Sequence, residues 1–476
     1  MTNIKFINRR EELGMLRALK SRNYFFLVLR GRRRIGKTTL VLKAIPDAFY
    51  FFVWPNKSLE WILEETCRLY NLPKFIRFGD IVNHVLDQGS VIFFDEFQNF
   101  LSVEKSVYGE LQRLLDERKH RGKPVRMIVS GSSYSLLNKV FNDAASPLYG
   151  RKTQELLLDE LPAEDLFAAL GITLESFIEF WAVFGGVPYY YEIIDPKRSL
   201  MDNLKAEIIQ NDPSLIEEGK TVLAIEFGGE TKTYSTILSG ISQGKTKMSE
   251  LASLFGGKKG EVNKYLDVLR KEYLLIRRIT PITKDPNKSR EGVYAINDNF
   301  LSFWHCFIED KRSYLEQGRR EEVVDFLEKN IGSFVGRAFE KFILYMMRKG
   351  YFGEFQKAGR EWGKIPPRFN PEKGKDAYEI DIVGLNEQAK EALFAECKWE
   401  SRVNAHTVAR ELNGKTAYVD WLRNERKERL AVFAKSFSKR IDELDGKPVS
   451  CFDLNDLEKM LREGRRKQRS TSVKQI

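Results

Sequence analysis

The stretch NYFFLVLRGRRRIGKTTLVLKAI, Asn23 to Ile45, decides the architecture of the front of this chain. NYFFLVLR is an apolar run of strand length, and the residues after Lys37 keep helical spacing. Between them stands G-x-x-x-x-G-K-T, whose glycines let backbone N–H groups turn towards phosphate oxygens at a helix N-terminus. The sequence therefore predicts a nucleotide site in which Lys37 reaches the β- and γ-phosphates and the Thr38 hydroxyl binds Mg²⁺. The other residues expected to cradle the nucleotide are Gly31, Arg32, Arg33, Arg34, Ile35, Gly36 and Thr39.

A second buried strand supports this site. GSVIFFDEFQNF places an apolar run directly before Asp95 and Glu96. An acid that ends a strand beside such a loop predicts Asp95 as a ligand of the metal, and Glu96 is placed to orient or deprotonate the attacking water. The next strand, VRMIVSGSS, ends in hydroxyls, so Ser130 or Ser132 either senses the γ-phosphate or caps a helix. These patterns predict nucleotide hydrolysis.

Composition limits the remaining possibilities. A chain of 476 residues with 42% hydrophobic and 30% charged residues is expected to fold into several domains. No apolar stretch reaches membrane length, and four scattered cysteines (Cys67, Cys306, Cys397 and Cys451) favour a reducing cytoplasm. The net charge of +11 suggests a polyanionic partner. The basic end of the chain, from Lys459, is interpreted either as a disordered extension or as a nucleic-acid contact.

Several further motifs carry a resemblance. FINRREEL at Phe6, GRRRIGKTTL, IFFDEFQNF, VSGSS, SPLYGR and FGGVPYYYE occur in an order that resembles archaeal-type ATPases of the AAA+/STAND group. The resemblance implies ATP as the nucleotide, with Asn8 and Arg9 near the adenine. It also implies that Arg151 reaches a nucleotide phosphate in cis or in trans, although an ordinary salt bridge is the alternative for this arginine.

The middle of the chain changes pattern. Three helix-sized segments begin near Tyr234, Lys247 and Lys258, and IRRITPITKDPNKSREGVYAIND follows as two strands around a basic loop. This order predicts a winged helix-turn-helix, which binds DNA through its phosphates or packs against protein instead. The candidate DNA contacts are Lys258, Lys259, Lys264, Lys271, Lys284, Lys288 and Arg290.

A hairpin near the C-terminus carries unexpected charges. In YEIDIVGLNEQAKEALFAECKW, Tyr378 to Trp399, strand alternation puts Glu396 and Lys398 on one face. A partner strand that carries Asp381 brings a second carboxylate alongside. Two carboxylates and a lysine on adjacent strands predict a Mg²⁺ site for phosphodiester hydrolysis.

This arrangement resembles the PD-(D/E)xK nuclease superfamily. The resemblance implies that Asp381 and Glu396 bind Mg²⁺ or Mn²⁺, that Lys398 positions water and phosphate, and that Glu340 of a preceding helix supports them. Ile380 stands before Asp381, where proline is common in that superfamily. The alternative is a buried charge network in an inactive descendant of a nuclease.

Together these patterns predict a multidomain α/β protein. Its parts are a P-loop ATPase core (1–158), a helical lid (159–225), a winged helix-turn-helix (226–310), a restriction-endonuclease-like α/β domain (311–458) and a basic tail (459–476). We expect a cytoplasmic, Mg²⁺-dependent ATPase that binds DNA and couples ATP to DNA cleavage, without a membrane partner. The alternatives are an ATP-gated DNA-binding regulator that does not cut, and a STAND-type switch that binds protein or forms homo-oligomers through its winged helix.

Overall fold

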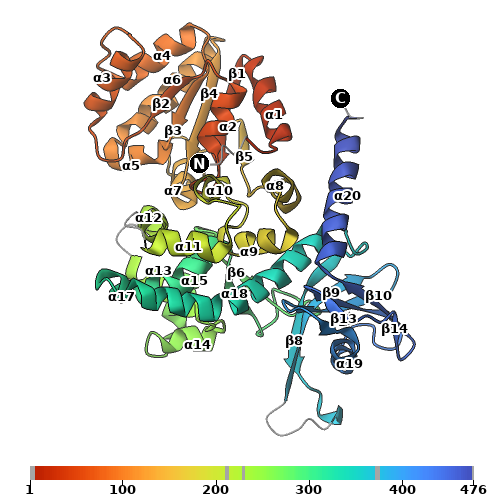
Figure 1. Cartoon of the computed structure of the whole chain (residues 1–476). Coiled ribbons are helices and arrows are strands. Elements are labelled where there is room, and N and C mark those ends of the chain that lie inside the picture. The colour runs from red at the N-terminus through yellow and green to blue at the C-terminus, as the bar shows by residue number, and fades with distance from the viewer. Residues whose placement is uncertain (1–5, 210–213, 228–230, 370–375, 474–476) are drawn as a thin grey trace.

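The computed structural model describes residues 6–209, 214–227, 231–369 and 376–473. A five-stranded sheet forms the N-terminal part of the molecule, at the top of Figure 1. All its paired strands are parallel, in the order β2-β3-β4-β1-β5. Its strands are β1 (Tyr24–Arg30), β2 (Phe49–Phe52), β3 (Ile92–Asp95), β4 (Val125–Gly131) and β5 (Gln154–Leu157). The central strands β1, β3 and β4 are nearly continuous apolar runs, because a parallel sheet buries both faces.

Helices cover both faces of this sheet. Helices α1 (Arg10–Lys20) and α2 (Lys37–Ala44) share one buried cluster with alternate residues of β1. The other face is covered by α3 (Leu59–Leu69), α4 (Phe78–Asp87), α5 (Phe100–Val103), α6 (Ser106–His120) and α7 (Tyr134–Phe141). Because all five strands run the same way, the loops that follow β1, β3 and β4 meet at one edge of the sheet.

A helical region follows the sheet. It contains α8 (Ala163–Leu170), α9 (Leu174–Phe184), α10 (Pro188–Ile193), α11 (Leu200–Ile209) and α12 (Ser214–Phe227). Next come α13 (Thr231–Ser242), α14 (Met248–Ser253), α15 (Lys259–Lys271) and the antiparallel hairpin of β6 (Ile276–Ile279) and β7 (Val293–Ile296). Three helices followed by a hairpin is the element order expected from the sequence. Helices α16 (Asn299–Phe307) and α17 (Arg312–Glu316) complete this region.

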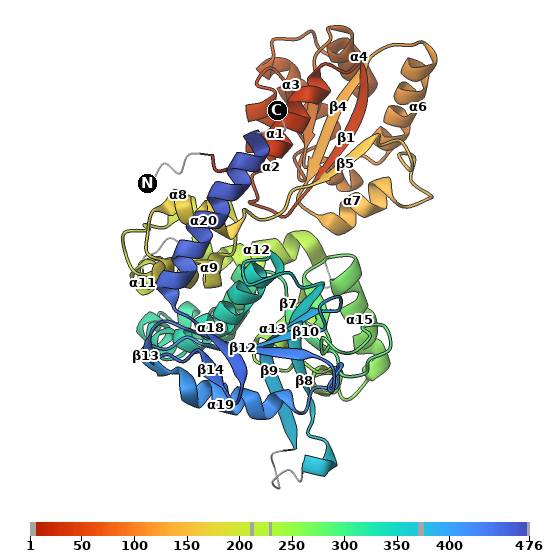
Figure 2. The ribbon, with the colours of Figure 1, turned by 90° about the vertical axis from the view of Figure 1, so that its right-hand side faces the viewer.

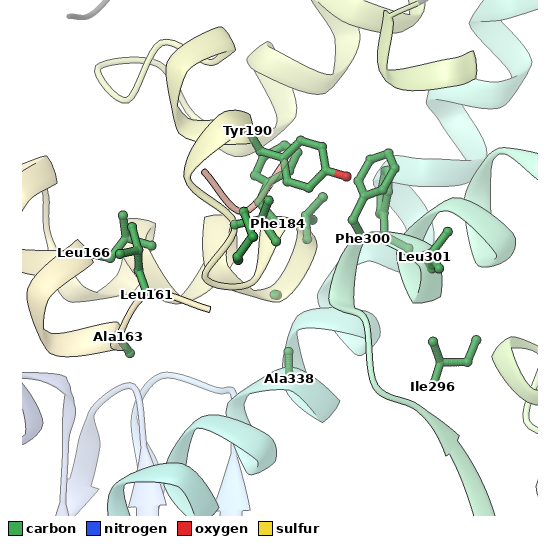
Figure 3. Close-up of a cluster of buried hydrophobic side chains, with 14 of the residues drawn as sticks. Leu161, Ala163, Leu166, Phe184, Tyr190, Ile296, Phe300, Leu301 and Ala338 are labelled. Atoms are coloured by element: carbon green, nitrogen blue, oxygen red, sulfur yellow. The ribbon is translucent and has the colours of Figure 1, made fainter. Parts of the chain in front are cut away.

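One buried cluster joins the helical region to its neighbours. Figure 3 shows the ring of Tyr190 from α10 facing Phe300 from α16, and the two ring centroids lie 4.6 Å apart. The same cluster includes Leu166 of α8, Phe184 of α9 and Ala338 of the long helix α18 (Arg320–Arg348). The parts of the chain predicted as separate domains therefore share a continuous apolar core.

The C-terminal part is built on a mixed six-stranded sheet in the order β14-β15-β12-β10-β9-β8. Its strands are β8 (Lys357–Lys364), β9 (Ala377–Asn386), β10 (Glu391–Lys398), β12 (Lys427–Ala434), β14 (Glu443–Leu444) and β15 (Lys447–Phe452). Helix α18 packs with one face and α19 (Ala405–Thr416) with the other. The short strands β11 (Val403–Asn404) and β13 (Phe437–Lys439) pair beside it.

The basic end of the chain is helical. Helix α20 (Leu454–Val473) leaves the C-terminal sheet and runs back along α8 and α9 (Figure 2). Leu457 and Leu461 are buried, and the guanidinium of Arg462 lies 5.4 Å from the ring centroid of Phe167. The interpretation of a disordered extension is therefore wrong as far as Val473, because an apolar stripe anchors the start of the helix; residues 474–476 lie outside the described residues. Across the described ranges, no helix is long and apolar enough to cross a membrane.

Candidate functional site

The loop after β1 turns into α2 as the sequence predicts. Gly36 adopts a left-handed φ of 92° immediately before the helix, a conformation that glycine reaches without strain. A Cβ at Gly31 would lie 2.8 Å from the carbonyl oxygen of Leu158, so that position also requires glycine. Ile35 is buried beneath the loop, and Thr39 is exposed on α2. The Lys37 ammonium donates to the carbonyl oxygens of Gly31 (2.8 Å) and Arg32 (3.0 Å), which holds it within the loop.

Asp95 lies directly beside the loop. Its carboxylate accepts hydrogen bonds from the hydroxyls of Thr38 (2.6 Å) and Tyr50 (3.2 Å), and from Ser130. A hydroxyl and a carboxylate are hard oxygen ligands of the kind that Mg²⁺ prefers. The donor set therefore fits Mg²⁺, which Thr38 and Asp95 would hold. Ser130 donates to Asp95 and does not cap a helix.

Glu96 is held by two neighbours. Its carboxylate accepts from the Ser132 hydroxyl (2.7 Å) and from the side-chain amide of Gln98 (2.6 Å). Of the serines after β4, Ser133 is the cap of α7, accepting a bond from the Leu136 N–H. Gln98 was not among the predicted site residues, since a glutamine in a short loop carries no distinctive pattern.

The loop arginines face acids of the helical region. Arg32 pairs with Glu160 at 2.8 Å and also with Asp298, the N-cap residue of α16. Arg34 donates to both carboxylate oxygens of Glu218 on α12, at 3.1 and 3.3 Å. Glu218 is 5% exposed and Asp298 is 3% exposed, so both carboxylates depend on these arginines for much of their charge compensation. The phosphate-binding loop is thus tied by ion pairs to two helices far along the chain.

Asn8 and Arg9 lie immediately before α1, and Arg9 is its N-cap residue. The side-chain amide of Asn8 donates to Asp165, and the guanidinium of buried Arg9 donates to the carbonyl oxygen of Asp159. Both residues therefore tie the N-terminal segment to the start of the helical region. Their role at the adenine stays a prediction.

Arg151 lies away from the phosphate-binding loop of its own chain. Its guanidinium pairs with Asp116 on α6 at 2.7 Å. Both charges influence the pKa of Tyr24, the first residue of β1, so the pair lies near the start of that strand. The loop follows the opposite end of that strand. Within its own chain Arg151 therefore forms an ordinary salt bridge, the alternative to a phosphate contact. A phosphate contact in another subunit stays a prediction.

The C-terminal sheet brings its predicted residues together. Ala395 pairs with Ile382, so Asp381 and Glu396 lie at the same end of the adjacent strands β9 and β10. The Cys397 N–H donates to Asp381 at 2.8 Å. Glu396 forms an ion pair with Lys398 at 3.5 Å and a shorter one with Lys415 of α19 at 3.0 Å. Lys415 could not be predicted from the sequence, because nothing local distinguishes it from other helical lysines.

The electrostatics of these carboxylates favour the binding of a cation. Burial and the nearby Glu396 raise the pKa of Asp381 to about 6. Burial and Asp381 raise the pKa of Glu340 to about 7, which places Glu340 within electrostatic reach of the pair. One carboxylate oxygen of Glu396 is buried without a hydrogen-bond partner among the described residues. Asp381 and Glu396 thus fit a divalent cation, although no group of three His, Cys, Asp or Glu side chains in the described ranges is arranged to hold a metal.

The β6–β7 hairpin docks onto the C-terminal sheet. In the β6–β7 loop, the Ile282 N–H donates to the carbonyl oxygen of Arg360 (2.9 Å), and Thr283 donates to buried Glu361 on β8. The predicted DNA-contacting lysines of α15 stay on the surface, and Lys258 and Lys271 pair with acids of their own helix. The hairpin loop therefore contacts another part of the same chain, strand β8.

Comparisons with known proteins agree with the geometry of the core. Residues 23–159 match the AAA domain family AAA_14, and residues 304–409 match DUF234, described as archaea bacterial proteins of unknown function. The uncharacterized protein MJECL04 of Methanocaldococcus jannaschii is 30% identical over 466 residues, which cover 95% of this chain and 99% of that protein.

Solved structures give the fold of the front half. The Walker-type ATPase PABY2304 of Pyrococcus abyssi superposes with a TM-score of 0.50 at 17% identity, covering 63% of this chain and 96% of that chain. The ORC2 protein of Aeropyrum pernix gives a TM-score of 0.38 at 13% identity, over 66% of this chain and 95% of that chain, which is too distant to support an argument. The first of these supports an α/β P-loop ATPase fold with an attached helical region.

Proposed function

This chain belongs to the family of Methanocaldococcus jannaschii MJECL04 and carries an AAA-type P-loop ATPase domain, and from that premise we propose an ATP-controlled nuclease. In this proposal, a Mg²⁺-dependent ATPase core sets the state of a C-terminal phosphodiesterase that acts on DNA. The ATPase is the supported part, and the DNA-directed activity is the proposed part.

The arrangement around Asp95 and Glu96 carries the proposal for ATP hydrolysis. Lys37 and the backbone N–H groups of the loop would bind the phosphates, and Thr38 and Asp95 would hold a Mg²⁺ ion that offsets phosphate charge. Ser132 and Gln98 fix the Glu96 carboxylate, so that it can accept a proton from an attacking water.

The arginines of the loop support control by ATP. Arg32 and Arg34 pair with Asp298 and Glu218, and phosphate oxygens compete with those carboxylates for the same guanidinium groups. ATP binding would then loosen α12 and α16 from the core. Since α16 shares its buried cluster with α18, the helix against the C-terminal sheet, a shift there reaches the second site.

The buried, unpaired oxygen of Glu396 carries the proposal for phosphodiester hydrolysis. Asp381 and Glu396 would hold Mg²⁺ or Mn²⁺, which supplies charge neutralisation at the phosphate and an acidic bound water. Lys398 and Lys415 lie on the Glu396 side, where they orient the carboxylate and can bind the scissile phosphate. Glu340 is placed to accept a proton near neutral pH, given its raised pKa of about 7.

A regulator that binds DNA without cutting is the second candidate. The ion pairs of Glu396 with Lys398 and Lys415 favour it, because two ammonium groups already compensate the charge that a metal ion would otherwise offset.

Two assays test the proposal. Replacing Glu96 by Gln is expected to lower ATP turnover by about 10²-fold or more while ATP still binds, because water activation is lost. Nicking of supercoiled plasmid with Mg²⁺ or Mn²⁺ is expected from the native protein and not from Lys398→Ala. Lys390→Ala removes an exposed lysine of the β9–β10 turn, which pairs with Glu425, and should cut normally. Equal, metal-independent nicking by all three proteins would reject the nuclease and leave the regulator.

A further inference from the structure

A large cleft separates the winged-helix hairpin from the C-terminal sheet. Its volume is about 1600 Å³, and it is lined on one side by β6 and β7 and on the other by α18, β8 and β9. Glu340 and Asp381 of the phosphodiesterase site line the same cleft. The hairpin loop that docks on β8 spans part of this boundary, so the cleft is bounded by contacts within the chain.

Positive charges from three elements meet in this cleft. They are Arg277 of β6, Arg337, Lys341 and Arg348 of α18, and Arg360 of β8. Arg277 donates to the side-chain oxygen of Asn297 (3.2 Å), and Arg348 donates to a backbone carbonyl of β8, so both have neutral partners. Among the described residues, only Arg360 of these five forms an ion pair, with Glu379.

These cations destabilise one another. Burial, followed by Arg277 and Arg337, lowers the pKa of Lys341 to about 8. Burial, followed by Arg348 and Arg360, lowers the pKa of Arg277. Glu160 and Glu340 offset part of this repulsion at Lys341. Like charges held close together still raise the free energy of the unbound protein, and an anion with several charges would relieve it.

The geometry selects a polymeric anion. Cations on β6, α18 and β8 line the cleft together with Asp381, and a chain of phosphodiesters offers successive charges that match several such cations at once. Phosphate contacts by Arg and Lys supply the sequence-independent part of nucleic-acid binding.

We propose that this cleft binds the phosphodiester backbone of a nucleic acid through Arg277, Lys341 and Arg348 and directs it to Asp381. The proposal rests on the proposed function for the role of Asp381. It moves the principal contact away from the exposed face of α15, where Lys258 and Lys264 project to solvent.

Fluorescence anisotropy on the full chain tests this assignment. The probes are a labelled single strand and a labelled duplex of about 20 nucleotides per strand, titrated between about 50 and 300 mM KCl. All proteins carry Lys398→Ala and are measured in EDTA, so binding is read without cleavage. The cleft variant is Arg277→Gln with Lys341→Gln. The matched control, Lys258→Gln with Lys264→Gln, removes the same charge from α15.

We expect the cleft variant to bind at least one probe about 10- to 60-fold more weakly at about 0.1 M salt, with the salt slope reduced by nearly two contacts. The control should bind within about twofold of the parent. If the cleft variant does not fold, Arg337→Gln with Arg348→Gln gives the same test, because both side chains are exposed at the rim.

Three outcomes overturn the proposal: unchanged binding by the cleft variants, a loss seen only in the α15 control, or no binding of either probe by the parent. Failure of the proposed function is a separate observation. Tight, cleft-dependent binding by a native protein that never nicks plasmid would retain this inference and reject the nuclease. Cleft substitutions that leave binding unchanged, made in a protein that retains Lys398 and still nicks plasmid, would reject this inference and retain the nuclease.

Discussion

The ion pair between the phosphate-binding loop and α12 gives the sharpest prediction. Glu218 is 5% exposed and lies 3.1 Å from the Nε of Arg34 and 3.7 Å from that of Arg33. Burial would lower the pKa of Arg34, but the hydrogen bond and charge of Glu218 raise it above its usual value. If phosphates take these arginines from Glu218, then ATP binding must first break this pair.

Glu218→Gln removes the competing charge while keeping the shape of the side chain. A hydrogen bond to a charged group contributes about 1.5–3 kcal/mol, and the partial exposure of Arg34 reduces this to about 1–2 kcal/mol. At about 1.4 kcal/mol for each factor of ten, we expect ATP to bind about 5- to 30-fold more tightly to the variant.

Isothermal titration calorimetry with Mg²⁺ and a non-hydrolysable ATP analogue measures this effect. The control is Glu217→Gln, one residue earlier on α12, whose carboxylate pairs with Lys220 and Arg312 and not with the loop. Glu217→Gln should leave the affinity unchanged. Equal or weaker binding by Glu218→Gln would refute the reasoning, because Arg34 would then keep Glu218 when the nucleotide is bound.

Further predictions concern the core, the helical region and the second site. Gly131→Ala places a Cβ 2.2 Å from the Gln98 side-chain oxygen, so ATP turnover should fall about tenfold at unchanged affinity, whereas Gly109→Ala, with open space around it, should have no effect. His305 is fully buried and burial lowers its pKa from 6.5 to about 3, so the unfolded state takes up the proton first as pH falls. Urea unfolding should therefore show the native chain losing about 2 kcal/mol of stability between pH 6.5 and pH 5, a loss that His305→Leu should abolish. Lys415→Ala should slow metal-dependent plasmid nicking about 10- to 100-fold, and an unchanged rate would remove this lysine from the site.

Sequence could predict what is encoded locally. The loop from Gly31 to Thr38 and the acids Asp95 and Glu96 follow from short motifs joined to a strand or a helix, and the structure places them at one edge of the sheet. Asp381 and Glu396 could be placed together for a similar reason, because a hairpin fixes which residues of its two strands are neighbours.

Contacts between segments far apart in the chain could not be predicted from local sequence patterns. Glu218 lies 184 residues from Arg34, and Asp298 lies 266 residues from Arg32, so only the packing of α12 and α16 against the core reveals these pairs. The helical conformation of the basic tail depends likewise on a docking site at α8, which its composition does not indicate. The cleft of cations is also a product of packing, since β6, α18 and β8 contribute separately to it.

The central claim is that nucleotide at the P-loop controls chemistry at the C-terminal site. The most direct test is the rate of plasmid nicking with Mg²⁺, measured with and without ATP, for the native protein and for Lys37→Ala. The account predicts that ATP changes the rate for the native protein, while Lys37→Ala nicks at a rate that does not respond to ATP. A native rate that is independent of ATP, or an equal response by Lys37→Ala, would contradict it.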